Sequence, residues 1–381
     1  MTAENKMTAH EPLFLVVKRA ERSSKQMLLF RLGAVLLSIL AGGLFILAIG
    51  QDPIKVYGLI LSGATRSKLA FQGTIKLTIP LCISALGVTL AFKMKFWNIG
   101  GEGQIIMGGI FATYFALWHA NWPHIPLMLV CFLAGLIGGG LWGLMPALCK
   151  VKWGTNETLL TLMLNYIALY LVVYLQNGPW QDPSANGFPK IATFAPNAHL
   201  GKVLGVQAGW IVMLVLVAVL WVYLRQSKQG YEISVVGESQ DTARYAGIQV
   251  KKVILRTMFL SGAIAGLCGM LQAVGTDNTL SVGIAGGVGF TAITVAWLCN
   301  LNPGMILVVS FLFSVLEKGS GVVQSKLGIS SDSAAVLQGV ILFFILASEF
   351  FVRYSFVFRK KQKQAPKAPA AQAPAPAQKE A

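Results

Sequence analysis

Long apolar runs separated by short polar segments dominate the hydropathy pattern of this chain. A membrane helix needs about 20 mostly apolar residues, and the runs at 27–50, 208–224 and 334–351 are close to that length. Residues 27–50 follow a 26-residue polar lead, so they are interpreted as a first span and not as a signal peptide. The pattern predicts an all-α, polytopic transmembrane helical bundle. The ten expected spans cover residues 27–50, 69–92, 100–119, 125–148, 156–176, 208–224, 257–275, 285–299, 303–317 and 333–352.

Composition and the placement of charge agree with this interpretation. Hydrophobic residues make up 55% of the 381 positions and charged residues 12%, against about 25% charged residues in soluble domains. The net charge is +16, and with an inward N-terminus 22 of the 31 Lys and Arg lie on the inner side, seven lie outside and two lie within spans. This bias predicts cytoplasmic N- and C-termini. Lys and Arg on the inner side would face the anionic headgroups of the lipid bilayer. This placement accounts for the excess of basic residues, so no nucleic-acid partner is expected.

Three parts are expected along the chain. Residues 1–26 are a cytoplasmic lead, residues 27–352 form the transmembrane domain, and residues 353–381 are a basic, Ala/Pro-rich tail that is expected to be disordered. Ten spans divide into five and five, which suggests an inverted repeat. In support, the glycine-rich segments 98–105 and 283–290 each open a span.

Several sequence features limit the chemistry of the chain. It contains no Walker A sequence, no GxSxG elbow and no dinucleotide fingerprint, so it is not expected to hydrolyse anything or to hold a cofactor. Its five cysteines lack CxxC spacing and its four histidines lack HExxH spacing, so no metal site is expected. Glycines 135, 139, 143, 262 and 266 follow the small-xxx-small spacing that favours close helix packing in lipid.

Polar residues at membrane depth are candidate sites, because they are costly there unless they are paired or face water. Asn98, Glu102 and Gln104 lie among glycines that can unwind the start of the third span. They are expected near a polar passage. Alternatively, Glu102 pairs with Lys93 or Lys95, or favours the helix N-terminus through the helix dipole.

A second polar cluster opens the fifth span. Thr158, Thr161 and Asn165 recur at helical spacing and therefore share one face. That face either lines the solute pathway or forms hydrogen bonds between helices.

Two loops are also informative: 300–303 is expected to be a tight turn, and the long outer loop 177–207 is either an ordered cap or a plain connector.

The polar segment 225–256 contains six basic residues and is expected to face the cytoplasm. Its middle, 238–248, is expected to be a short helix that ends at Gly237 and Gly247. Such a helix could be held by a soluble motor protein. The alternative is a long loop without a partner.

Four motifs occur together in this chain: FWNIGGEGQIIMGG at 96–109, TNETLLTLMLNYIALYLV at 155–172, YEISVVGESQDTARYAGI at 231–248 and GGVGFTAITVAWLCNLNPGMILV at 286–308. Together they resemble the permease subunit of bacterial ABC importers for nucleosides and simple sugars, within the branched-chain amino acid/ribose permease superfamily. The resemblance covers about residues 30–352. Gly101 stands where the motif usually has alanine, and the tail after residue 359 lies outside the common pattern.

The resemblance implies which residues act. It implies that Asn98, Glu102 and Gln104 lie near the translocation pathway. Thr158, Thr161 and Asn165 are added as candidate pathway residues because their helical spacing places them on one face. The residues expected to couple to an ATPase lie in the short helix and at its ends: Gly237, Glu238, Asp241, Ala243, Arg244, Tyr245, Ala246 and Gly247. Expected partners are an ABC ATPase subunit, a second and different permease, and an extracytoplasmic substrate-binding protein or lipoprotein.

The resulting hypothesis is an inner-membrane permease that is not itself an enzyme and imports a nucleoside or simple sugar at the expense of ATP. One rival is a secondary transporter driven by an ion gradient, with Glu102 or Glu157 as the coupling carboxylate. The other is a membrane scaffold that recruits a soluble partner through 225–256, which leaves the polar residues within the spans unexplained.

Overall fold

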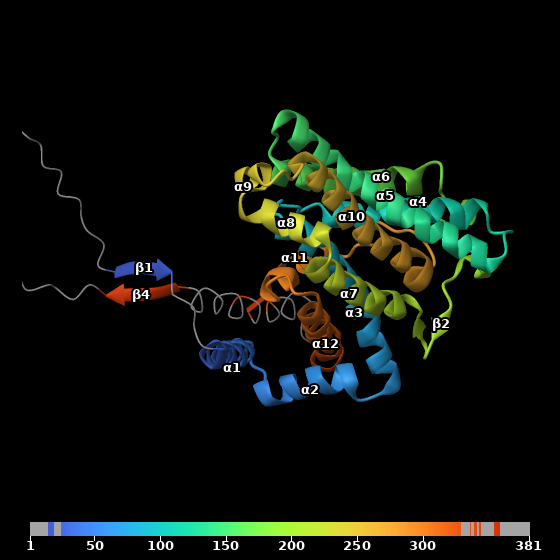
Figure 1. Cartoon of the computed structure of the whole chain (residues 1–381). Coiled ribbons are helices and arrows are strands. Elements are labelled where there is room, and N and C mark those ends of the chain that lie inside the picture. The colour runs from blue at the N-terminus through green and yellow to red at the C-terminus, as the bar shows by residue number, and fades with distance from the viewer. Residues whose placement is uncertain are drawn as a thin grey trace, which may run out of the picture. The chain divides into compact units, whose positions relative to one another are not determined.

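The computed structural model describes residues 14–18, 24–328, 336, 339–340, 343 and 354–358. These fall into two compact units, one formed by Met1–Leu40 with Ile341–Ala381 and the other by Ala41–Val340 (Figure 1). Of the tail expected to be disordered, 353–381, the structure describes only Tyr354–Phe358, which form a strand; the rest lies outside the described residues, as does nearly all of the expected span 333–352.

The first unit joins the two ends of the chain through a two-stranded sheet. Strand β1, Phe14–Lys18, pairs antiparallel with β4, Tyr354–Phe358, so that Phe14 lies opposite Phe358. The same unit contains the first part of helix α1, Ser24–Ala48. The strands were not expected, because a five-residue apolar stretch beside polar residues does not indicate which distant segment it will pair with.

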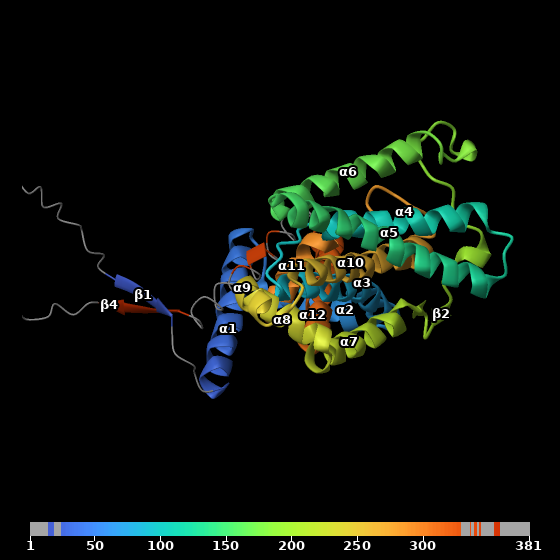
Figure 2. The ribbon, with the colours of Figure 1, turned by 45° about the horizontal axis from the view of Figure 1, so that its top comes forward.

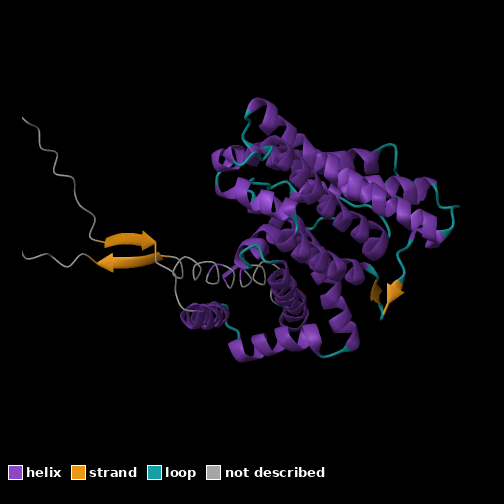
Figure 3. Cartoon of the chain, in the orientation of Figure 1, coloured by secondary structure: helices purple, strands orange, loops and turns teal. Residues whose placement is uncertain are grey.

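The second unit is a helical bundle with one small hairpin (Figure 3). Its longer helices are α2 Pro53–Thr65, α3 Lys68–Lys93, α4 Gly101–Trp118, α5 His124–Trp153, α6 Glu157–Asn177, α7 Gly209–Gln226, α8 Lys228–Glu238, α10 Val250–Leu271, α11 Val288–Leu298 and α12 Pro303–Leu327. The short elements are α9 Gln240–Tyr245, the turns η1 Pro183–Ala185 and η2 Pro196–Ala198, the π-helical end of α10, Gln272–Asp277, and the strands β2 Lys202–Val203 and β3 Val206–Gln207.

Six described helices are long and apolar enough to cross a membrane, and a seventh span results if the bent pair Leu36–Ala48 and Pro53–Thr65 is counted as one. The fold is therefore a mostly helical, multi-pass bundle, as expected, but the count of ten spans is not reproduced. The expected span 285–299 is wrong as a crossing helix. Its helix, α11, has 11 residues and so is about 17 Å long, roughly half the hydrocarbon thickness.

Helix α2 replaces what was expected to be a polar outer loop. Asp52 caps its first turn by accepting a hydrogen bond from the amide of Ile54 at 2.9 Å, and Pro53 occupies the first helical position. Val56 and Ile60 are buried, on the side that packs against α12. The Asp-Pro pair is the signal that could have revealed this helix.

Glycines let three helices of the second unit pack closely. Helix α10 packs against α5 and α4, and all three are seen together in Figures 1 and 2. A Cβ atom on Gly139 would overlap the carbonyl oxygen of Gly262, and one on Gly108 would overlap the backbone of Gly266. The expectation of close packing from the small-xxx-small spacing is confirmed.

The segment 178–208 is an ordered cap and not a loose connector. The amides of Phe194 and Leu200 donate to the carbonyls of Asn278 and Val274, both at 2.8 Å. Two of its own apolar side chains, Ile191 and Phe194, are buried. These contacts attach the cap to the far end of α10 and the segment that follows it.

Candidate functional site

Asn98 organises the irregular segment between α3 and α4. Its side chain is fully buried and its amide group donates to Gln104 Oε1 at 3.2 Å and to Ser261 Oγ at 3.3 Å. Its side-chain oxygen accepts from the Gly100 amide at 3.0 Å and from Gln104 Nε2 at 3.1 Å. Ser261 in turn donates to the carbonyl of Gly87 at 2.7 Å. Asn98 and Gln104 therefore tie α3, α4 and α10 together.

Thr161 and Asn165 on α6 hold the same glycine-rich segment from the other side. The Thr161 hydroxyl accepts from the Ile99 amide at 3.2 Å and donates to the carbonyl of Glu157 at 2.7 Å. The Asn165 side chain accepts from the Gly103 amide at 2.8 Å and donates to the carbonyl of Ile99 at 2.9 Å. Both side chains are buried, so this face of α6 forms hydrogen bonds between elements.

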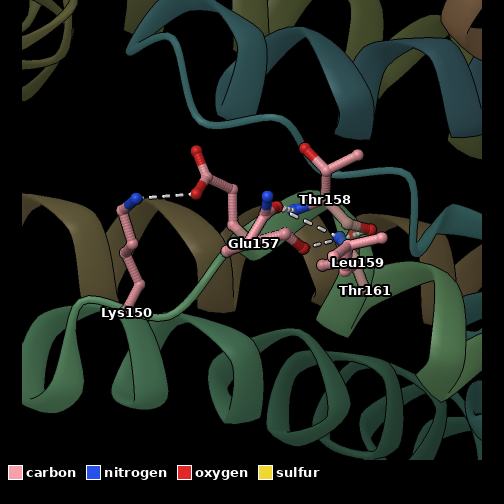
Figure 4. A network of polar contacts seen from close by, with 6 residues as sticks. Lys150, Glu157, Thr158, Leu159 and Thr161 are labelled. Carbon is pink, nitrogen blue, oxygen red and sulfur yellow. Dashed lines mark hydrogen bonds and ion pairs between the residues drawn. The ribbon is translucent and has the colours of Figure 1, made fainter.

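Thr158 lies in the first turn of α6, beside Thr161 (Figure 4). Its amide donates to the side-chain oxygen of Asn156, which caps the helix and also accepts from the Leu159 amide. The Thr158 side chain is partly exposed, and no hydrogen bond to it is formed within the part of the chain that the structure describes. Of the three residues expected on one face, Thr161 and Asn165 are brought to the network and Thr158 is not.

Glu102 joins two helix N-termini that are far apart in the sequence. It lies in the first turn of α4, and its two carboxylate oxygens accept hydrogen bonds from the amides of Gly287 and Gly289 at 2.6 and 2.7 Å. These amides belong to the start of α11, where the helix dipole favours a negative charge. The helix-terminus alternative is therefore supported, and pairing with Lys93 or Lys95 is not seen among the described residues.

The two glycine-rich segments that suggested a repeat meet at this junction. A Cβ atom on Gly101 would make an ordinary van der Waals contact with the backbone of Gly289, at 3.5 Å, so alanine would fit at position 101. A Cβ atom on Gly289 would overlap Glu102. Glycine is therefore required at position 289 for close backbone approach, and the similarity of the glycine-rich segments 98–105 and 283–290 was the signal that could have paired them.

A cavity of about 180 Å³ adjoins this junction. It is lined by the turn and first residues of α11, by α3 and by α12, through Leu81, Gly286, Val288, Thr291, Phe313 and Glu317. Glu317 was missed by sequence reasoning, because it is the last residue of the expected span 303–317 and was not weighed as a candidate site. Its position beside Thr291 shows the polar character of this space.

Glu157 pairs with a lysine and is not an isolated carboxylate. Lys150 Nζ at the end of α5 lies 2.7 Å from Glu157 Oε2 at the start of α6, with 35% and 14% of the two side chains exposed (Figure 4). The pair closes the short connection between the two helices. Because Lys150 is partly solvated, the pair contributes at most about 1 kcal/mol to stability.

The polar segment 225–256 is mostly helical, with more helix than the one short helix expected at 238–248. Ser227 caps α8 by accepting from the Gly230 amide at 2.9 Å, and Ser239 caps α9 by accepting from the Thr242 amide at 3.2 Å. Gly247 ends the short helix with a φ of 76°, as expected. Gly237 does not begin it: Gly237 and Glu238 are the last two residues of α8, and Ser239 separates the two helices.

Helix α9 presents almost all of its side chains outward. Ala243 is buried, whereas Asp241, Arg244, Ala246 and Gly247 are exposed and Tyr245 is 94% exposed. Arg244 and Asp241 form an ion pair at 2.6 Å on this surface. An aromatic side chain with that exposure gains almost no packing energy from the residues that the structure describes.

Helix α8 connects this surface to the bundle. Gly237 packs so closely on the carbonyl of Lys93, at the end of α3, that a Cβ atom there would overlap it. Glu232 accepts from Arg256 of α10 at 3.1 Å. Helix α8 therefore contacts both α3 and α10, and α10 carries Ser261, the hydrogen-bond partner of Asn98.

Comparison with known proteins agrees with the motifs. A family model described as the permease component of a branched-chain amino acid transport system matches residues 71–346. The glucose ABC transporter permease protein TsgB13 of Haloferax volcanii is 30% identical over 347 residues, which cover 87% of this chain and 91% of that protein. The guanosine ABC transporter permease protein NupP of Bacillus subtilis is 30% identical over 350 residues, covering 88% and 97%. The nucleoside ABC transporter permease protein NupB of Lactococcus lactis is 29% identical over 323 residues, covering 82% and 88%.

Proposed function

Because the chain belongs to the branched-chain amino acid transport system permease family, we propose that it carries a nucleoside or a related simple sugar into the cell. The observation that carries this proposal is similarity along nearly the whole length of permeases named for guanosine, nucleosides and glucose. The chain is a multi-pass membrane protein and not an enzyme. Transport energy comes from ATP hydrolysed on a separate subunit.

Three partners complete the proposed importer. An ABC ATPase docks on α9, a second permease of different sequence forms the other half of the pore, and an extracytoplasmic binding protein or lipoprotein delivers the solute. The exposed side chains of Arg244, Tyr245 and Asp241 support the first of these contacts. The helix α8 then carries the movement of the ATPase to α3 and α10, and the bundle alternates between outward-open and inward-open states.

The proposed solute passage runs beside the junction of α4 and α11. Glu102 holds the start of α11, while Asn98, Gln104, Thr161 and Asn165 hold the start of α4. Their polar atoms are largely taken by protein partners, so we assign these residues mainly to shaping the passage. Direct contact with solute hydroxyl groups is assigned to the cavity beside Thr291 and Glu317 and, at the inner end, to Thr158.

Reconstitution tests the proposal. The permease is co-expressed with its ATPase, second permease and binding protein, and uptake of labelled guanosine, uridine and glucose into proteoliposomes is measured with and without ATP. We expect ATP-dependent uptake of a nucleoside, with competition by other nucleosides and not by amino acids. Transport of branched-chain amino acids alone would overturn the proposed cargo while leaving the permease role intact.

The rival mechanism, driven by an ion gradient, fits the structure poorly. It requires a carboxylate that is free to take up and release an ion, but Glu102 accepts two backbone hydrogen bonds and Glu157 pairs with Lys150. Uptake that persists without ATP and collapses when an ionophore dissipates the gradient would revive it.

A further inference from the structure

Glu317 is a carboxylate without a partner in the middle of a membrane helix. It is the fifteenth of the 25 residues of α12, about 21 Å from the start of the helix and about 15 Å from its end, and therefore lies within the hydrocarbon layer of about 30 Å. Two other carboxylates of the bundle, those of Glu102 and Glu157, accept hydrogen bonds or form an ion pair. Glu317 forms neither with any residue that the structure describes. An unpaired charge at this depth is costly, which makes Glu317 a candidate for a functional contact.

The neighbouring lysine does not neutralise this charge. Successive residues of an α-helix point about 100° apart, and Lys318 lies against α3: a Cβ atom added to Gly73 of α3 would be 3.3 Å from Lys318 Nζ. No ion pair joins Lys318 to Glu317 within the described part of the chain. The Glu317 side chain instead borders the cavity of about 180 Å³ beside the junction of α4 and α11. Because Glu317 is also exposed, water or a solute in this cavity can reach its carboxylate.

The wall of this cavity has a polar part and an apolar part. Glu317 and Thr291 form the polar part, and because the Thr291 hydroxyl donates to the carbonyl of Gly287 at 3.3 Å, its oxygen can still accept a hydrogen bond. The apolar part consists of Leu81, Val288 and Phe313. A ribose ring matches both parts, since its hydroxyl groups lie along one edge and C–H groups cover the rest. The volume is below the range of about 300–1,000 Å³ for pockets that enclose a drug-sized ligand, so the cavity can receive the sugar ring and not a whole nucleoside.

We infer that Glu317 determines specificity for ribonucleosides by accepting hydrogen bonds from the two neighbouring hydroxyl groups of the ribose. A carboxylate offers two acceptor oxygens side by side, so hydroxyl groups on adjacent carbon atoms can donate to both at once. Hydrogen bonds from hydroxyl groups to a carboxylate are short and roughly twice as strong as those between neutral groups. Dinucleotide-binding folds hold a ribose hydroxyl group with a carboxylate in the same way. This inference rests on the proposed function, because it needs a nucleoside as the cargo.

Uptake of matched solutes tests this contact. The complete transporter is reconstituted in proteoliposomes, and ATP-dependent uptake of guanosine and of dideoxyguanosine, which lacks both ribose hydroxyl groups, is measured with an excess of solute-loaded binding protein. Glu317→Ala should slow guanosine uptake at least tenfold and dideoxyguanosine uptake less than threefold, since dideoxyguanosine has no hydroxyl pair to lose. Selection by the binding protein cancels, because the same binding protein serves the wild type and the variant. An equal fall for both solutes would overturn the inference.

Inosine separates the contribution of the ribose from that of the base. It keeps the ribose but lacks the amino group of guanine, whose N–H groups could also donate to a carboxylate. Glu317→Ala should slow inosine uptake as much as guanosine uptake. A loss confined to guanosine would place the edge of the base at Glu317 and overturn the inference.

Lys318→Gln is the matched control, because it removes a charge at the adjacent position of α12, which lies against α3. It should change the uptake of all three solutes by the same factor, and a change in preference equal to that of Glu317→Ala would overturn the inference. The melting temperature in detergent tests for a structural role. Glu317→Ala should leave it unchanged or raise it, because no partner is lost, and a clear fall would also overturn the inference. Absence of guanosine uptake by the wild type would refute the proposed cargo and this inference with it, whereas normal guanosine uptake with an unaltered preference would refute this inference alone.

Discussion

At the scale of single residues, the polar groups in this bundle act on backbone. Glu102, Asn98, Thr161 and Asn165 all accept hydrogen bonds from backbone amides in the irregular segments that open α4 and α11. Irregular backbone at membrane depth needs such partners, because no water reaches it from the lipid side. Without these side-chain acceptors, the amides of the glycine-rich segments would have no hydrogen-bond partner.

Replacement of the Glu102 carboxylate tests this role. In Glu102→Gln one side-chain oxygen remains, but the new NH₂ group faces a backbone N–H, so the amide of Gly287 or Gly289 loses its acceptor. Leaving one buried donor unsatisfied costs about 1–3 kcal/mol. We expect a lower melting temperature in detergent and a fall in uptake of about tenfold or more.

Glu157→Gln is the matched control for that variant. It removes a partly solvated ion pair with Lys150, worth less than about 1 kcal/mol, and should leave the melting temperature and uptake nearly unchanged. If the two variants behaved alike in both measurements, the special role of Glu102 would have to be abandoned.

At the scale of elements, the long helices could be predicted and the short ones could not. Helices α3, α5, α6, α7, α10 and α12 are each apolar over the width of a membrane, and each overlaps an expected span. Helices α2 and α8 are short and mixed in polarity, so that their capping residues were their main signal. Spacing alone does not predict the junction of α4 and α11, since its hydrogen-bond partners are 185 and 187 residues apart in the sequence and meet through packing.

The glycine contact between α5 and α10 gives a prediction for this scale. Gly139→Ala places a methyl group against the carbonyl of Gly262, so the helices must separate or shift. Overpacking of this kind costs about 1–3 kcal/mol. We expect a lower melting temperature, measured by loss of monodisperse protein on heating in detergent.

Gly321→Ala in α12 is the control, because open space surrounds that position and alanine favours a helix over glycine. It should be neutral or slightly stabilising. Equal destabilisation by both substitutions would show that the effect belongs to glycine replacement in general and not to the crossing of α5 and α10.

At the scale of the whole molecule, the proposed coupling surface and passage are linked by packed helices. The path runs from α9 through α8 to α3 and α10, and from these to the segments that open α4 and α11. The charged and aromatic face of α9 contributes nothing to the core apart from Ala243. Its sequence is therefore free to fit a partner.

Loss of the Tyr245 ring should weaken binding of the ATPase without harming the permease. Tyr245→Ala removes a side chain that is 94% exposed, so the melting temperature should not change, while co-purification of the ATPase should fall about tenfold. Tyr245 is a better position for this test than Gly247, because any side chain at the positive φ of Gly247 also strains the backbone.

Phe188→Ala provides the comparison on the cap segment 178–208. Phe188 is also an exposed aromatic residue, at 74%, but it lies in the connection expected on the outer side of the membrane. It should leave ATPase binding unchanged. Equal loss from both variants, or no loss from Tyr245→Ala, would remove α9 from the docking surface.

The carboxylate of Glu102 has a consequence for how the bundle can move. It is one of several contacts between the first and second halves of the chain, and it ties the start of α11 to the start of α4 through two short hydrogen bonds in a place where the backbones almost touch. A tilt of α11 must therefore carry the first turn of α4 with it or break both hydrogen bonds.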